Sequence, residues 1–285
     1  MGYKQYEPET LKKIQRKELE IIKEFSRICE KYEIPYFAVF GTAIGAIRHH
    51  GFIPWDDDVD FGMLREDYER FLVAADKEFG DRYGMAGPDC PRKFYNFVSK
   101  MYKKGTRFAT IYDHGNWDMG INIDIFVFDY MPRDPGKFRR QKRKALFLRS
   151  LYMIKNVNFY QSYVFGEGKT LQRLLCGGLH YLMKVFSPGN EWFCRAWKKN
   201  AVKYYRKSET VTQFNDTGIW ESRIRLEDLF PLQRVPFEDT YITVPKEYDK
   251  VLREMYGDYM QIPPKEKQQN HYPYILDLGE GEEKE

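Results

Sequence analysis

Apolar residues in the N-terminal part of the chain recur at helical spacing. Over residues 9–33 they fall three or four positions apart, with Lys and Glu between them, which predicts one long amphipathic helix. The pair Ile34-Pro35 follows this pattern and predicts where the helix ends. Residues 65–79 show the same spacing and predict a second amphipathic helix.

Short apolar runs between and after these helices predict strands, because they are rich in β-branched and aromatic residues. The predicted strands cover 36–40, 59–63, 94–102, 107–111 and 120–128. A short helix over 42–49 is predicted between the first two of them. Helices that alternate with strands, followed by several more strands, predict an α+β fold with a small mixed sheet flanked by helices.

The middle of the chain differs in composition from both ends. Between about 135 and 205 it is basic, aromatic and helical in pattern, with a GEGK loop at 166–169 and a predicted break at 187–189. From Val211 short strands follow, and one more helix is predicted between Pro245 and Gly257. The predicted organisation is a core over 1–134, a helical insertion over 135–210 and a C-terminal part over 211–285 that completes the core.

Composition argues against several classes of protein, among them nucleic-acid-binding, membrane-spanning and secreted proteins. Charged residues make up 31% of the 285 residues, the net charge is +4, and no nucleic-acid recognition motif is present, so a nucleic-acid partner is not expected. No apolar run approaches the roughly 18 residues that a membrane-spanning helix needs. The N-terminus lacks the order of a secretory signal, and the four cysteines form no CxxC pair. These features favour a cytoplasmic protein without a structural zinc site or a disulfide framework.

Four aspartates lie within five residues, in the segment WDDDVD. On an extended backbone Asp56, Asp58 and Asp60 point to one side and Asp57 to the other, although a turn at Trp55 would break this alternation. Carboxylates on one side repel one another unless a cation lies among them, and hard oxygen ligands suit Mg²⁺ or Mn²⁺. The sequence therefore predicts a divalent metal site at this strand, with Asp56 among its ligands. The alternative for Asp57 is a loop or helix-capping acid.

Further polar residues extend this site. Asp124 lies inside an otherwise apolar predicted strand, and we expect it to join the D-x-D pair of Asp58 and Asp60 as a third catalytic and metal-binding acid. Gly41 and Thr42 precede a predicted helix and offer N–H groups and a hydroxyl to phosphate oxygens. Arg48, further along that helix, is a candidate for binding an anionic oxygen. The order of these features predicts metal-dependent phosphate chemistry.

This order resembles that of the nucleotidyltransferase superfamily, and the segment GTAIGAIRHHGFIPWDDDVDFGM closely resembles the signature of the LicD/fukutin-type phosphotransferase family. The stretch PFEDTYITVPKEYDKVLREMYGDYMQIPP, followed by Lys267 and His271, is also similar to that family. The likeness covers about 33–64, 120–130 and 229–273, and is slight over 135–210. The resemblance implies a nucleotidyltransferase-like fold and magnesium-dependent transfer of a phospho-substituent from a nucleotide donor.

For the bacterial branch of the family, the resemblance implies transfer of phosphocholine from CDP-choline to a hydroxyl of a cell-surface glycan, a teichoic acid or a lipopolysaccharide precursor. One alternative is transfer from another CDP-alcohol, such as a polyol phosphate, and another is a non-catalytic relative that binds nucleotide or glycan. The donor diphosphate is expected beside Gly41, Thr42 and Arg48. Asp124 is expected either to complete the metal site or to take the proton of the acceptor hydroxyl. The zinc-binding cysteines of some animal relatives have no match here.

Several other residues have two interpretations each. Trp55 either stacks on the substrate or packs internally, and Lys267 and His271 either contact phosphate or form salt bridges near the C-terminus. Lys100, on a predicted strand, is a further candidate for a phosphate contact. The basic run KFRRQKRK at 137–144 is either a solvated helix face or, with the apolar segments after it, a surface that contacts an anionic membrane at its cytoplasmic face.

Overall fold

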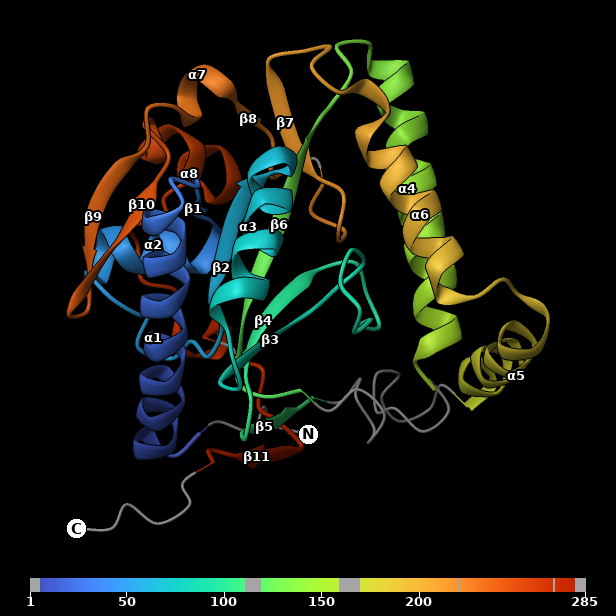
Figure 1. The fold of residues 1–285 in the computed structure, drawn as a ribbon, viewed down its shortest axis with the longest axis horizontal. Helices are drawn as coiled ribbons and strands as arrows, with labels where there is room; N and C mark the ends of the chain where they lie inside the picture. Colours follow the sequence, from blue (N-terminus) through green and yellow to red (C-terminus); the bar gives the residue numbers. More distant parts are fainter. Residues whose placement is uncertain (1–5, 111–118, 159–169, 220, 269, 280–285) are drawn as a thin grey trace.

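The computed structural model describes residues 6–110, 119–158, 170–219, 221–268 and 270–279, and Figure 1 shows its fold. Its helices are α1 (Pro8–Lys31), α2 (Phe40–His49), α3 (Arg65–Glu78), α4 (Pro135–Asn156), α5 (Thr170–Phe186), α6 (Asn190–Ala201), α7 (Leu226–Leu229) and α8 (Tyr248–Tyr256), with 3₁₀ turns η2 (Val202–Tyr204) and η3 (Lys265–Lys267). The order of helices and strands confirms the predicted α+β class.

A mixed sheet forms the centre of the molecule (Figure 1). Its strands are β1 (Phe37–Ala38), β2 (Asp60–Leu64), β3 (Tyr83–Ala86), β4 (Ser99–Lys103), β6 (Asn122–Tyr130), β7 (Thr210–Gln213) and β8 (Ile224–Arg225). The order is β1-β2-β6-β4-β3, and β7 joins β6 and β8. Strands β2 and β6 are parallel, while their other neighbours are antiparallel. Two further pairs are β9 (Gln233–Phe237) with β10 (Thr240–Val244), and β5 (Arg107–Ala109) with β11 (Ile275–Asp277).

Different elements cover the two faces of this sheet. On one face α1 and α3 pack through aromatic side chains, and Phe25 lies 4.9 Å from Phe61 of β2 and 5.0 Å from Phe71, measured between ring centroids. On the other face Phe37 and Phe128 pack with residues of α7 and α8. Gly62 permits this packing, because a Cβ there would lie 2.4 Å from the Phe37 ring. The sheet is thus buried on both sides.

The middle of the chain is helical, as predicted. Helices α4 and α6 form a pair beside the sheet, and α5 lies beyond the end of that pair (Figure 1). The break at 187–189 is confirmed, because α5 ends at Phe186 and α6 begins at Asn190. The GEGK loop at 166–169 lies outside the described residues. None of the helices in the described ranges is both long and apolar enough to cross a membrane.

Some observed strands differ from the predictions. The strand predicted over 94–102 begins only at Ser99, because the Asn96 side chain accepts a hydrogen bond from the Val98 N–H at 2.9 Å and holds a turn there. The strand β3 was not predicted at all, since its sequence YGMA has no alternating pattern. The predicted helix after Pro245 is confirmed as α8.

Candidate active site

The sheet brings together charged residues that lie far apart in the sequence. In the parallel pair β2 and β6, Asp60 lies opposite Asp124, and in the antiparallel pair β4 and β6, Lys100 lies opposite the same Asp124. Because neighbouring strands lie about 4.8 Å apart, the three residues form a row across the sheet. The Lys100 ammonium donates to the Asp124 carboxylate and, at 3.0 Å, to the Asn122 side chain. Asp60 and Asp124, predicted to share a site, are therefore neighbours.

Two more of the predicted acids lie in the loop that leads into β2. The backbone of Asp56 is held by Gln15 of α1, whose side-chain N–H donates to the Asp56 carbonyl at 2.9 Å. The Asp56 carboxylate lies over Gly41, where a Cβ would approach its Oδ2 to 2.8 Å. Glycine at this position therefore allows the acid to approach α2. The Asp58 carboxyl lies close enough to Asp56 for its charge to raise the Asp56 pKa.

The acids raise one another's pKa values. Partial burial and the charge of Asp58 raise the pKa of Asp56 to about 9. Burial, together with the charges of Asp58 and Asp124, raises the pKa of Asp60 well above its usual range. Ionised carboxylates crowded in this way are stabilised by a nearby cation, and a hard divalent ion supplies the most charge in the smallest volume. The donor chemistry of the loop and sheet thus fits Mg²⁺ or Mn²⁺.

The metal site nevertheless stays a prediction. Within the described ranges, no three His, Cys, Asp or Glu side chains converge as ligands of one ion, and the Lys100 ammonium contacts one of the proposed ligands, Asp124. If a metal binds, Asp58 and Asp60 are the residues that would hold it, with Asp56 and Asp124 beside them.

Asp57 has hydrogen-bond partners from two distant segments of the chain. Its side chain is only 3% exposed and accepts hydrogen bonds from the Tyr6 hydroxyl at 2.6 Å and from the His271 backbone N–H at 2.8 Å. The His271 ring nitrogen Nδ1 lies 3.3 Å from Asp57 and 3.4 Å from Asp58. The interaction of the His271 ring with the Asp57 carboxylate is the largest cause that raises the pKa of His271, to about 9. Asp57 therefore holds the segments around Tyr6 and His271 against the acidic loop. This places the His271 ring beside Asp58.

The residues predicted to bind phosphate already have partners within the protein. Helix α2 begins at Phe40, two residues earlier than predicted, so both Gly41 and Thr42 lie in its first turn. The buried Thr42 hydroxyl accepts a hydrogen bond from the Asp60 N–H at 2.7 Å and joins α2 to β2. Arg48 donates to the Tyr259 carbonyl at 2.6 Å, and its guanidinium carbon lies 5.9 Å from the centre of the Trp55 ring.

These partners do not exclude contacts with substrate. The N–H groups of the first α2 turn remain beside the acids, and both Arg48 and Trp55 are partly exposed. Lys267 ends the turn η3 and is exposed to solvent. Phosphate or nucleotide binding by these residues stays a prediction.

A sixth acid, which was not among the predicted site residues, interacts with several of these aspartates. Glu18 of α1 is 2% exposed, and its Oε2 has no hydrogen-bond partner. Burial, and then the charges of Asp57 and Asp58, raise the pKa of Glu18 well above its usual range. The signal was available, because Glu18 occupies an inward position between Ile14 and Ile21 where helical spacing calls for an apolar residue.

Glu18→Gln is expected to remove part of the pH dependence of unfolding. A carboxyl whose pKa is higher in the folded than in the unfolded protein lowers the free energy of unfolding as pH rises above about 4.3 toward the folded value. Without this carboxyl, the free energy of unfolding relative to wild type should increase with pH, by up to about 1.4 kcal/mol per pH unit. Urea denaturation at several pH values, in the presence of a metal chelator, measures this difference.

The exposed Glu9→Gln variant is the matched control on the same helix, since the Glu9 side chain is 78% exposed. Its stability curve should run parallel to that of the wild type at every pH. A Glu18→Gln curve that is equally parallel would contradict the assignment.

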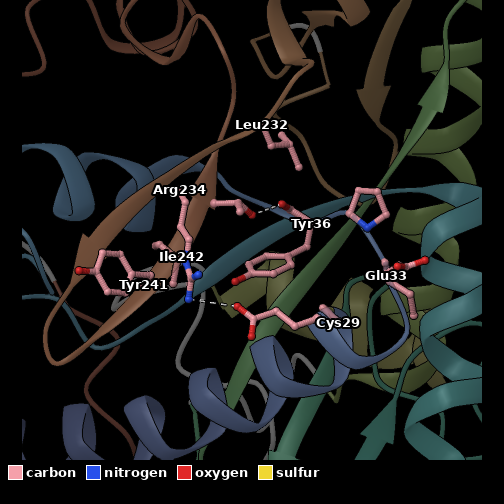
Figure 2. Close-up of a pocket in the computed structure, with 11 residues that line it drawn as sticks. Cys29, Glu33, Tyr36, Leu232, Arg234, Tyr241 and Ile242 are labelled. Atoms are coloured by element: carbon pink, nitrogen blue, oxygen red, sulfur yellow. Dashed lines mark hydrogen bonds and ion pairs between the residues drawn. The ribbon is translucent and has the colours of Figure 1, made fainter.

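A cavity of about 300 Å³ opens at a different place, between the C-terminal end of α1 and the β9–β10 pair (Figure 2). Tyr36, Leu232 and Ile242 line it, and Arg234 reaches across to Glu30 at 3.3 Å. Tyr36 precedes β1, which runs antiparallel to β2, so this cavity lies toward the end of β2 that is remote from Asp60. None of the acids described above lines it, so the cavity is not part of the candidate active site.

Comparisons with known proteins bear on this arrangement. A family model described as LicD/FKTN/FKRP, nucleotidyltransferase domain, matches residues 33–170, which include β2, β6 and all five aspartates described above. The lipopolysaccharide cholinephosphotransferase LicD of Haemophilus influenzae is 29% identical over 279 residues, which cover 94% of this chain and 98% of that protein. Residues 33–170 therefore match the LicD/FKTN/FKRP family, and the chain is similar to LicD along nearly its whole length.

The other similar proteins match a smaller share of the chain. An uncharacterized protein of Rickettsia typhi is 40% identical over 141 residues, which cover 43% of the chain and 44% of that protein. An uncharacterized protein of Rickettsia prowazekii is 42% identical over 48 residues, or 17% of the chain and 18% of that protein. The resemblance noted in the acidic segment is thus confirmed at the level of the family.

Proposed function

We propose that this protein is a metal-dependent phosphotransferase that moves phosphocholine from CDP-choline to a hydroxyl of a glycan such as that of lipopolysaccharide. The observation that carries this proposal is the pairing of Asp60 with Asp124 on neighbouring parallel strands, with Asp58 beside them. Similarity along nearly the whole length of a cholinephosphotransferase supports the choice of the transferred group.

The proposed reaction is a displacement at phosphorus. The acceptor hydroxyl attacks the phosphorus that carries choline, the bond from that phosphorus to the oxygen of CMP breaks, and CMP leaves. A divalent ion, when bound, would neutralise the phosphate oxygens and stabilise the leaving oxygen. Asp58 and Asp60 are the carboxylates that would hold it. Asp124 either completes that site or accepts the proton of the attacking hydroxyl.

Aromatic and acidic side chains beside the site suit a quaternary ammonium group. Burial, and then the charges of Asp60 and Asp58, raise the pKa of the hydroxyl of the half-exposed Tyr256, at the end of α8. Trp55 lies on the same loop as Asp56. Aromatic faces attract choline-like cations, and nearby carboxylates strengthen that attraction. Tyr256 and Trp55 are thus our candidates for contacting choline.

The experiment that tests the proposal measures CMP release from CDP-choline. Purified protein is incubated with CDP-choline and Mg²⁺, with and without lipopolysaccharide, and in parallel with EDTA. We expect CMP to form at the highest rate when donor, metal and acceptor are all present, and choline to appear on the acceptor. CDP-ethanolamine and CDP-polyols, tested under the same conditions in place of CDP-choline, serve as the comparison donors.

Each contrary outcome has a distinct meaning. Release of CMP from a CDP-polyol but not from CDP-choline would show the same chemistry with a different transferred group. Metal-dependent binding of CDP-choline in calorimetry, without product from any donor, would instead identify a non-catalytic nucleotide-binding protein. CMP formation unaffected by EDTA would refute the metal requirement.

A further inference from the structure

Helix α5 presents an apolar face to solvent. Its side chains Leu171, Leu174, Leu175, Leu182, Val185 and Phe186 are each more than half exposed, and Phe186 is 80% exposed. At about 100° per residue they span roughly 120° of the helix circumference, so they form one continuous strip. We call these six residues the α5 apolar face.

The opposite side of α5 is the one that packs on the protein. His180 and Gly177 are buried there, and the His180 ring nitrogen Nδ1 forms a hydrogen bond with the Ile154 carbonyl of α4 at 2.8 Å. The helix is therefore oriented with its apolar face outward by a specific contact. Monomeric proteins rarely leave so large a contiguous apolar strip in water, so we expect another surface to cover it.

The helices around this face are strongly basic. Helix α4 contains eight Lys and Arg residues and α5 contains two, and neither helix contains an Asp or a Glu. On α4 the exposed residues Arg140, Arg143, Lys144 and Phe147 follow one another at helical spacing. This strip runs toward the C-terminal part of α4, where α5 packs at Ile154, so the cations lie on the helix that carries α5.

Charge decides between the two kinds of surface that could cover the strip. A second copy of the chain would bring an equally basic α4 and α5 against the first, and like charges at an interface are unfavourable. An anionic bilayer would attract the cations of α4 and accept the apolar side chains of α5 at its interface. The combination of a leucine-rich face with cations and no acids therefore favours a membrane.

We propose that the α5 apolar face and the exposed basic strip of α4 dock the protein on an anionic phospholipid membrane, with α5 lying parallel to the surface. The proposed function explains only why docking would be useful to the enzyme. An acceptor such as lipopolysaccharide is anchored in a membrane by its lipid, and docking brings the active site to it. The binding itself needs no substrate.

The test is flotation of the full-length protein with vesicles, measured without nucleotide or glycan. We expect it to bind vesicles of phosphatidylcholine mixed with phosphatidylglycerol at low salt, and to bind pure phosphatidylcholine much less. The variant Leu174→Glu/Leu182→Glu should lose more than about tenfold in partitioning, because it places two charges in the apolar face. The variant Arg140→Gln/Lys144→Gln should lose about fivefold for each cation removed.

The matched control is Val73→Glu, which changes an equally exposed apolar residue on α3, 61% exposed and outside the α5 apolar face. It should bind vesicles like the wild type. Circular dichroism and thermal melting should show that all variants are folded, since every substituted residue is exposed.

The outcomes separate this proposal from that of the enzyme activity. Failure of the wild type to float with anionic vesicles, or undiminished binding by Leu174→Glu/Leu182→Glu, would overturn the docking surface even if CMP release is observed. A dimer that this double variant dissociates, in the absence of vesicle binding, would assign the face to a second copy instead. Binding by a chain that releases no CMP would support the surface and leave only the proposed reaction in error.

Discussion

Asp124→Asn is expected to lower kcat/KM for phosphocholine transfer by about a thousandfold or more, without unfolding the protein. The amide has the shape of the carboxylate, and its oxygen can still accept the hydrogen bond that Lys100 donates to Asp124. What it loses is the negative charge beside Asp60 on the neighbouring strand. Initial rates of CMP release, with kcat and KM determined separately, measure the effect.

The companion variant Asp58→Asn distinguishes the two roles left open for Asp124. If Asp124 is a metal ligand, both variants should weaken Mg²⁺ or Mn²⁺ binding in calorimetry. If Asp124 takes the proton of the acceptor hydroxyl, Asp124→Asn should bind the metal like the wild type while kcat falls. Asp239→Asn is the matched control, because that side chain is 66% exposed in a surface pair with Lys23. Rates close to wild type in both Asp58→Asn and Asp124→Asn would refute the assignment of the site.

Local patterns predicted the features of this protein that depend on a few consecutive residues. The long helix α1 follows from its apolar repeat, and helix α8 lies where it was predicted, between Pro245 and Gly257. The resemblance in the segment around Asp58 and Asp60 led to the family that the comparisons confirm. These inferences need no knowledge of which segments are neighbours in space.

Contacts across long sequence separations could not be predicted in this way. Asp57 is joined to Tyr6, 51 residues earlier, and to His271, 214 residues later, and neither partner is indicated by its own surroundings in the sequence. The register that sets Asp60 against Asp124 depends on which strands pair, and many registers are compatible with the same apolar pattern. Thr42 and Arg48 were predicted to bind phosphate from their residue types alone. Residue types could not show that the Thr42 hydroxyl and the Arg48 guanidinium have hydrogen-bond partners inside the protein.

A buried ion pair joins α3 to β6 in a similar long-range way. Arg65, at the start of α3, is 5% exposed and donates two hydrogen bonds to Asp129 of β6, at 3.0 and 2.6 Å. A third goes to Asp89 at 3.0 Å, and the guanidinium carbon lies 5.6 Å from the ring of Trp197 of α6. Asp129 itself is 2% exposed, so water does not replace Arg65 if it is removed.

Arg65→Ala is therefore expected to lower the free energy of unfolding by about 3–5 kcal/mol, because it leaves the Asp129 carboxylate buried and unpaired. Arg65→Lys should restore part of that loss and not all of it, since one ammonium group cannot reproduce the two parallel bonds to Asp129. Urea denaturation gives both values. The control is Lys23→Ala, whose partner Asp239 is exposed and whose loss should cost less than about 1 kcal/mol. An Arg65→Ala variant no less stable than Lys23→Ala would show that the buried pair with Asp129 does not stabilise the fold.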